Sequence, residues 1–227
     1  MKKSNKSCDL KSCFLCTGCL PEWLLPLEMH RQNFIFKKGE TIFSEGDPVK
    51  GIFFLYQGKV KVHTQWGSGK QLILRFAKEG DIIGYRGLGK EKVYPVSASA
   101  LEKVNVCFID NAFFETTLQV NHSLTYRFMQ FYANELQDAE KRLGNLAHKE
   151  VKVRVAETLL MLKNHFGERS DGFIDILLTK QDLASYAGTT YETYSRVINE
   201  LVKKKVVRQS GKDIGIRNEA LLRKVSL

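Results

Sequence analysis

The sequence predicts an α+β protein in three parts: an N-terminal β roll, a long helix, and a C-terminal helix-turn-helix followed by a β wing. Short runs of β-branched and aromatic residues, separated by glycines, fill about residues 34–110. Apolar residues spaced alternately by three and four come next, and two short helical segments then meet at a glycine. We expect domain boundaries at 1–120, 121–148 and 149–227.

The composition is that of a globular chain with a basic C-terminal part. Of the 227 residues, 43% are hydrophobic and 26% are charged. No window approaches the ~20 consecutive apolar residues of a membrane helix, and the N-terminus has no apolar signal segment, so we expect a cytoplasmic protein with no membrane partner. The net charge is +10, and residues 141–227 hold 17 basic against 10 acidic residues. A polyanionic partner, nucleic acid before membrane, fits this distribution.

The predicted strands are short and closely spaced. Val60-Lys61-Val62 alternates apolar and polar residues, as expected for a strand with one wet face. Strands at this spacing indicate a small barrel or roll rather than a parallel sheet. The expected strands cover residues 33–36, 41–43, 51–56, 60–63, 72–76, 81–83 and 104–109.

The long helix carries two apolar faces. A heptad seam runs along it, formed by His122, Thr125, Met129, Tyr132, Leu136, Ala139, Leu143 and Leu146. Leu124, Phe128 and Phe131 lie on an adjacent face. Such a helix can pack on its own domain and still pair with a second subunit, so we expect a homodimer through residues 122–146. The alternative is a helix buried within one domain. A second helix is expected over 151–166 and a strand over 173–178.

The C-terminal segment has the pattern of a helix-turn-helix. Thr179 and Asp182 approximate a capping box, and Gly188 suits a left-handed turn after the first helix. Thr189 or Thr190 then caps a second helix that runs to about residue 202. A lysine run at 203–205 and an apparent hairpin over 206–216 follow, which predicts a wing that lays basic side chains along phosphates.

Glu192, Ser195 and Arg196 share the predicted exposed face of the second helix. Arginine can donate to guanine O6 and N7 together, and glutamate can accept from cytosine N4. Two other interpretations stay open: Glu192 as the capping-box acid of Thr189, and a surface ion pair between Glu192 and Arg196.

These features together resemble the CRP/FNR family of bacterial transcription regulators over nearly the whole chain. Residues 179–196 are similar to the family's DNA-reading motif, and the E-x-x-S-R form is the FNR-type version. The resemblance implies a jelly-roll sensor domain of the cyclic-nucleotide-binding type, a dimerisation helix and a winged helix-turn-helix. It also implies an inverted-repeat DNA site with TTGAT-like half-sites, in which Glu192 and Arg196 read the G·C pair. The implied DNA-contacting set is Thr179, Thr190, Tyr191, Glu192, Ser195 and Arg196.

The roll departs from the cyclic-nucleotide-binding members of the family. Tyr85 stands where their ribose-binding glutamate is expected, and Tyr94-Pro95 stands where Arg-Ser would hold the cyclic phosphate. An anionic phosphate without its arginine would lose a charge-assisted bidentate contact. We therefore expect no cAMP binding, and sequence alone does not place Arg86 in the pocket.

Four cysteines cluster near the N-terminus, at Cys8, Cys13, Cys16 and Cys19. In a reducing compartment this favours metal or redox chemistry. The FNR branch holds a [4Fe-4S] cluster on three N-terminal cysteines and one from the roll. Cys107 falls on the position of the last, but the N-terminal spacing differs from the FNR pattern.

The cysteine pattern allows three interpretations. A [4Fe-4S] cluster would use Cys13, Cys16, Cys19 and Cys107, with Cys8 as the alternative ligand. Zinc would use the four N-terminal cysteines, since four thiolates satisfy it. In the third interpretation, the thiols bind no metal.

The other function classes have weaker support. The five histidines form no metal-ligand spacing, and no Walker loop or nucleophile elbow is present, so we expect no enzyme. A purely scaffolding protein would leave the reading helix unexplained. We expect an allosteric regulator, in which an effector at the roll changes helix pairing and hence DNA affinity, with RNA polymerase as a further partner.

Overall fold

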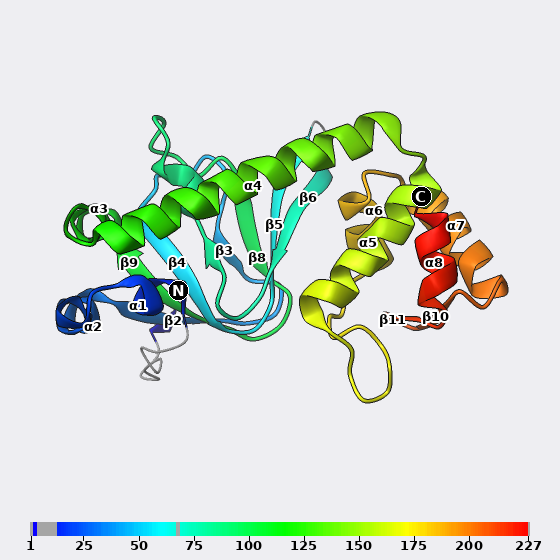
Figure 1. The fold of residues 1–227 in the computed structure, drawn as a ribbon, viewed down its shortest axis with the longest axis horizontal. Coiled ribbons are helices and arrows are strands. Elements are labelled where there is room, and N and C mark those ends of the chain that lie inside the picture. The colour runs from blue at the N-terminus through cyan, green and yellow to red at the C-terminus, as the bar shows by residue number, and fades with distance from the viewer. Residues whose placement is uncertain (1, 4–12, 67–68, 227) are drawn as a thin grey trace. The chain divides into compact units, whose positions relative to one another are not determined.

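The computed structural model describes residues 2–3, 13–66 and 69–226, and its elements are labelled in Figure 1. Cys8 lies outside the described residues. The chain divides into two compact units, Met1–Trp66 with Leu74–Leu136 and Gly67–Ile73 with Gln137–Leu227. We call them unit 1 and unit 2. The division falls inside the long helix, and the three-part boundaries expected from the sequence stay a prediction.

Two antiparallel sheets form the roll. One has the order β1-β2-β9-β4-β7, and the other has the order β3-β8-β5-β6. The first consists of β1 (Lys2–Lys3), β2 (Gln32–Phe36), β9 (Val104–Asp110), β4 (Gly51–Gln57) and β7 (Ile82–Ile83). The second consists of β3 (Thr41–Phe43), β8 (Ser97–Ala100), β5 (Val60–Trp66) and β6 (Lys70–Ala77). All seven expected strands are present, with ends shifted by up to three residues.

Aromatic residues fill the interior of the roll. Phe53 on β4 pairs in register with Phe108 on β9, and their rings lie 4.9 Å apart. Phe43 stacks on Tyr94 at 4.2 Å, inside the same core. The strand β8 was missed from sequence because Ser97-Ala98-Ser99-Ala100 lacks the bulky residues that mark a strand.

Helices and 3-10 turns precede, interrupt and follow the strands of the roll. They are α1 (Phe14–Gly18), the 3-10 turn η1 (Pro21–Trp23), α2 (Leu24–His30), the 3-10 turn η2 (Tyr85–Leu88), α3 (Asn111–Val120) and α4 (His122–His148). The buried Asn121 separates α3 from α4, and its side-chain oxygen accepts from the Leu20 amide at 2.8 Å. Figure 1 shows α4 as one continuous helix, as the heptad seam predicts.

Unit 2 contains the expected helix-turn-helix and wing. Its elements are α5 (Val151–Phe166), α6 (Lys180–Tyr186), α7 (Tyr191–Lys203), β10 (Val207–Ser210), β11 (Asp213–Ile216) and α8 (Glu219–Val225). The strand expected over 173–178 was wrong. Ile174, Ile176 and Leu178 are buried, but the segment forms only an isolated bridge between Ile174 and Glu168. Its apolar residues reflect core packing rather than sheet pairing.

Within the described ranges, no helix combines the length and the apolar character that crossing a bilayer requires.

Candidate functional site

A reciprocal capping box starts α6. The Thr179 hydroxyl accepts from the Asp182 amide at 3.0 Å, and the Asp182 carboxylate accepts from the Thr179 amide at 3.1 Å. The shorter side chain of aspartate therefore completes a box that usually has glutamate or glutamine. This confirms the predicted start of the first helix.

Hydrogen bonds from Arg154 of α5 stabilise the turn between α6 and α7. Gly188 has φ +64°, the left-handed conformation expected there, and a Cβ at this position would come within 2.4 Å of Leu146. Arg154 donates to the carbonyls of Ala187 and Gly188, at 3.0 Å each. One guanidinium thus satisfies the two carbonyls at the turn and positions the start of α7.

Thr190 is the N-cap of α7. Its hydroxyl accepts from the Thr193 amide at 3.2 Å. The capping-box position is therefore Thr193, and Glu192 is not the acid of a box on Thr189. This resolves one of the alternatives left by the sequence.

The exposed side of α7 carries Glu192 and Arg196. Both side chains are exposed, and no salt bridge joins them within the part of the chain that the structure describes. Tyr191, at the first turn, is 44% exposed. One carboxylate and one guanidinium thus lie a helical turn apart with their polar groups available to a ligand.

Ser195 differs from its two neighbours on the predicted reading face. It is half-buried, and its hydroxyl oxygen is buried with no hydrogen-bond partner among the described residues. In this conformation the Ser195 hydroxyl does not face solvent, although its backbone position lies between Glu192 and Arg196. Sequence spacing gives the face of a helix but not the rotamer of a small side chain.

The opposite side of α7 packs into the core of unit 2 through Tyr194, Val197, Ile198 and Leu201. Tyr194 is 0% exposed, and burial raises the pKa of its hydroxyl above the usual range. No described residue offers this hydroxyl a hydrogen bond. A buried hydroxyl without a partner costs free energy because it has lost its bonds to water.

We expect Tyr194→Phe to stabilise the protein. Removing the unpaired hydroxyl while keeping the ring should raise the free energy of unfolding by about 1 kcal/mol. The matched control is Tyr94→Phe, because the Tyr94 hydroxyl donates to the Gly51 carbonyl at 2.7 Å, and its loss should destabilise. Urea unfolding of both variants checks the two signs. Equal destabilisation would mean that Tyr194 has a partner in solution.

The wing is an antiparallel hairpin, and its Arg208 side chain already contacts other residues of unit 2. Its guanidinium donates to the Asp171 carbonyl and lies 4.3 Å from the centre of the Phe173 ring. Other basic side chains around α7 and the wing are exposed and lack a salt bridge within the described ranges: Lys203, Lys205, Lys212 and Arg217. These four charged groups, rather than the Arg208 guanidinium, are therefore available to a ligand.

Four cysteines come together in unit 1. Cys13, Cys16 and Cys107 are 7%, 5% and 3% exposed in one hydrophobic cluster, and Cys19 packs against it. Cys13 is the N-cap of α1, and its sulfur accepts from the Cys16 amide at 3.4 Å. Burial, with a further effect of Cys13, raises the pKa of Cys19 to about 11.

The cysteines have the chemistry of a metal site but not a ready arrangement. Among the described residues, no three histidine, cysteine, aspartate or glutamate side chains form a group that could hold a metal ion. The structure thus brings the sequence-predicted thiols into one cluster without placing three of them as ligands.

The cysteine-bearing helix α1 packs directly on α4. The Phe14 ring lies 6.0 Å from Phe128 and 5.7 Å from Phe131. Arg127 lies over the Phe14 ring at 4.5 Å and donates to the Thr17 hydroxyl at 2.6 Å. The cysteine-bearing helix α1 and these α4 side chains therefore form one packed contact.

The predicted seam of α4 faces outward. Met129, Leu136 and Leu143 are 59%, 61% and 68% exposed, whereas Leu124 and Phe128 on the adjacent face are buried. The two faces expected from the sequence are both present, and these three residues of the seam are uncovered in the single chain.

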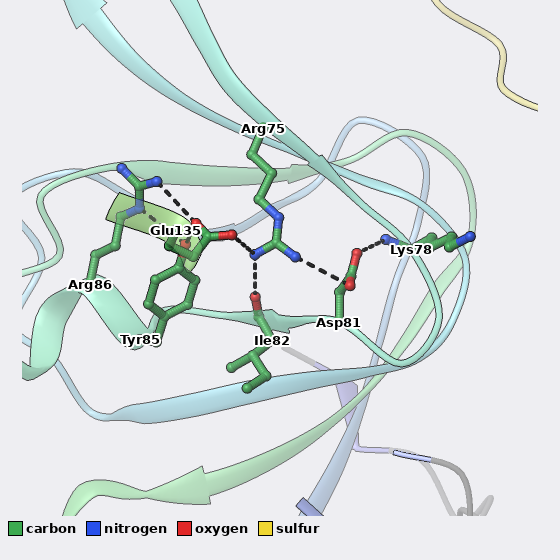
Figure 2. A network of polar contacts seen from close by, with 7 residues as sticks. All are labelled: Arg75, Lys78, Asp81, Ile82, Tyr85, Arg86 and Glu135. Carbon is green, nitrogen blue, oxygen red and sulfur yellow. Dashed lines mark hydrogen bonds and ion pairs between the residues drawn. The ribbon is translucent and has the colours of Figure 1, made fainter. Parts of the chain in front are cut away.

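At the cyclic-nucleotide position, the roll holds its own polar side chains. Tyr94, at the position where cyclic-nucleotide-binding members have an arginine-serine pair, is 3% exposed and packs in the aromatic core. Tyr85 and Arg86 lie in η2 and contact Glu135 of α4 (Figure 2). The structure therefore places Arg86 in a network that sequence alone did not reveal.

Comparisons with known proteins match both halves of the chain. The model of the cyclic nucleotide-binding domain matches residues 34–121, and that of the Crp-like helix-turn-helix domain matches residues 153–225. Electron transport regulator A of Shewanella oneidensis is 30% identical over 212 residues, covering 89% of this chain and 84% of that protein. The anaerobic regulatory protein of Bacillus subtilis is 33% identical over 183 residues, covering 78% and 77%.

Solved structures agree on the fold. FixK2 from Bradyrhizobium japonicum superposes with a TM-score of 0.77 at 24% identity, over 87% of this chain and 98% of that one. The relatives, the two domain matches and the helix-turn-helix together lead to one assignment: this chain belongs to the CRP/FNR family of transcription regulators.

Proposed function

We propose that the regulator reads an inverted repeat with TTGAT-like half-sites through Glu192 and Arg196. The exposed, unpaired state of these two side chains on α7 carries this proposal. Arg196 would donate to guanine O6 and N7, and Glu192 would accept from cytosine N4 of the same pair. The N-terminal turns of a recognition helix are the ones that enter the major groove.

The remaining DNA contacts divide by chemistry. Thr179, Thr190 and Tyr191 lie at the N-termini of α6 and α7, where helix ends favour phosphate. Ser195 would discriminate a neighbouring base after a rotamer change that exposes its hydroxyl. Phosphate contacts set position, whereas base contacts set sequence preference.

Two copies would pair along α4, through residues 122–146. The exposed apolar side chains of the seam support this, because Met129, Leu136 and Leu143 would otherwise remain in water. A two-fold dimer presents two recognition helices to the two halves of an inverted repeat.

A mobility-shift titration at several salt concentrations tests this function. A regulator of this kind should bind an inverted repeat of TTGAT-like half-sites more tightly than a scrambled duplex at every salt concentration. Both affinities should fall as salt rises, because lysine and arginine release counterions from phosphates. Equal affinity for the two duplexes would contradict sequence-specific reading.

For the effector, we propose a [4Fe-4S] cluster on Cys13, Cys16, Cys19 and Cys107, with Cys8 as the alternative ligand. The donor chemistry fits, since four thiols lie in or against one buried cluster, and thiolates are the usual ligands of such clusters. Binding would require the cysteine segment to rearrange, because no metal-holding group is preformed in the described residues. A bound cluster would supply a group that oxygen or nitric oxide can destroy.

The chain's own contribution is to couple the cysteine segment to the dimer helix. Cys13 caps α1, Cys16 lies within it, and Phe14 packs on the α4 aromatics. A rearrangement of α1 would alter the position of α4 and hence the pairing of two copies. The names of the relatives in Bacillus subtilis and Shewanella oneidensis, an anaerobic and an electron transport regulator, support redox sensing.

Iron and sulfide analysis of protein reconstituted without oxygen tests the cluster. The wild type should be brown and contain iron and sulfide, and Cys107→Ser should lose both. Cys8→Ser is the matched control and should keep them if the preferred ligand set is right.

Three results would contradict the cluster. Colourless wild-type protein without iron, tightly bound zinc that survives Cys107→Ser, or an unchanged iron content in Cys107→Ser would each do so. The alternative function is then a regulator that senses a different small molecule at the roll without metal.

The other parts of the proposal follow from the family. Tyr94, at the position where the phosphate-binding Arg-Ser pair is expected, is 3% exposed and packs in the aromatic core, and we propose that cAMP is not the effector. We also propose that this regulator acts in the cytoplasm, has RNA polymerase as a further partner and is not an enzyme.

A further inference from the structure

Three donors of the roll converge on one carboxylate of α4. Arg75 on β6 approaches one oxygen of Glu135 at 3.4 Å, and Arg86 in η2 approaches the other at 3.4 Å. The Tyr85 hydroxyl donates to the same carboxylate, as Figure 2 shows. Two guanidiniums and a hydroxyl around one carboxylate make a receptor for an oxyanion.

One of the two guanidiniums, that of Arg75, is held in the roll independently of Glu135. Arg75 also pairs with Asp81 at 3.2 Å and donates to the Ile82 carbonyl at 3.4 Å. Asp81 in turn accepts from the Lys78 amide at 2.9 Å. These contacts within the roll hold the Arg75 guanidinium independently of Glu135, although the guanidinium also lies 5.8 Å from the centre of the Phe131 ring of α4.

Charge balance makes Glu135 the exchangeable member. Among the described residues, Arg75 has Asp81 as a second carboxylate, whereas Glu135 is the carboxylate that pairs with Arg86. The three charged side chains are largely shielded from solvent: the exposed fraction is 18% for Arg75, 32% for Arg86 and 19% for Glu135. Without Glu135, one partly desolvated positive charge would be left uncompensated.

We propose that Arg75, Tyr85 and Arg86 form a binding site for a small oxyanion, a carboxylate or a phosphate, and that Glu135 is its internal occupant. The ligand takes the place of the Glu135 carboxylate, so the group that enters is a single carboxylate or phosphate. Displacement of Glu135 removes one contact between this part of α4 and the roll. A second contact there is the 2.6 Å hydrogen bond from the Tyr132 hydroxyl to the Tyr85 carbonyl.

This site deepens the effector side of the proposed function, since Tyr132 and Leu136 flank Glu135 on the helix that carries the seam. Only the effect of the ligand on the seam of α4 rests on the proposed function. Oxyanion binding itself is measured without DNA and without a metal, so the binding site and the proposed function can fail separately.

Calorimetric titration with inorganic phosphate, and in a second arm with acetate, tests the site. Glu135→Gln removes the competing charge but keeps the size of the side chain, and it should bind one of the two anions about tenfold more tightly than the wild type, or more. Glu140→Gln is the matched control, because Glu140 is an exposed acid on the same helix. It should bind like the wild type.

Adding Arg86→Gln to Glu135→Gln should abolish the gain. The arm that shows the gain identifies the ligand as carboxylate or phosphate. An equal affinity of Glu135→Gln and the wild type for both anions would overturn the proposal, as would the same gain in Glu140→Gln.

A second measurement uses the wild-type protein and does not depend on the folding of a variant. Saturating phosphate or acetate should speed amide hydrogen exchange in the α4 turn around Glu135, relative to chloride at equal ionic strength. Unchanged exchange with both anions would also overturn the proposal.

Discussion

Arg196→Ala should abolish preferential binding to the inverted repeat while leaving the fold intact. Arg196 is exposed on α7 and has no salt bridge in the described part of the chain, so its removal breaks no observed structural contact. A bidentate arginine–guanine contact contributes about 1–3 kcal/mol of discrimination. A homodimer loses it in both half-sites, so we expect specific affinity to fall by about 30-fold or more. Fluorescence anisotropy with specific and scrambled duplexes measures the change.

Lys212→Ala provides the control for Arg196. Lys212 lies exposed at the tip of the wing, where we expect it to contact phosphate rather than a base. Its loss should weaken binding to both duplexes equally and reduce the salt dependence. If Arg196→Ala behaved in the same way as Lys212→Ala, Arg196 would be a phosphate contact and the assignment of the reading pair would be wrong.

Leu136→Asp should convert the proposed α4 dimer into monomers and thereby remove high-affinity DNA binding. Leu136 is 61% exposed at the centre of the seam. Because the side chain is already partly buried, withdrawing one leucine from each copy costs roughly 2–4 kcal/mol of dimer stability, at least about 30-fold in the dissociation constant. Two aspartates facing each other add charge repulsion. Sedimentation velocity over a range of protein concentrations measures the shift.

Leu177→Asp is the matched control for the seam. Leu177 is 44% exposed in unit 2 and lies outside α4, so the same substitution there should leave the oligomeric state unchanged. A wild-type protein that sediments as a monomer at all concentrations, or a Leu136→Asp variant that remains dimeric, would show that the seam does not form the interface.

The helix-turn-helix could be predicted closely because its signals are local. Thr179 with Asp182, and Gly188 in its left-handed turn, act within a few residues, and the structure confirms each. The two faces of α4 were likewise predictable, since helical periodicity alone assigns Leu136 and Phe128 to opposite environments.

The parts that escaped prediction depend on long-range contacts or on side-chain rotamers. Arg75 and Glu135 are 60 positions apart, and only the packing of α4 on the roll brings them together. The choice of Thr190 over Thr189 as cap depends on backbone geometry, and the buried hydroxyl of Ser195 depends on its rotamer. The strand predicted over 173–178 was wrong because a buried loop can have the same apolar run of residues as a strand.

Selection from a duplex library randomised at the G·C position of both half-sites tests the reading pair most directly. The wild type should enrich G·C there, whereas the Glu192→Ala/Arg196→Ala variant should recover all four base pairs about equally while still binding DNA through its basic side chains. Continued enrichment of G·C by the double variant would contradict base reading by these two residues.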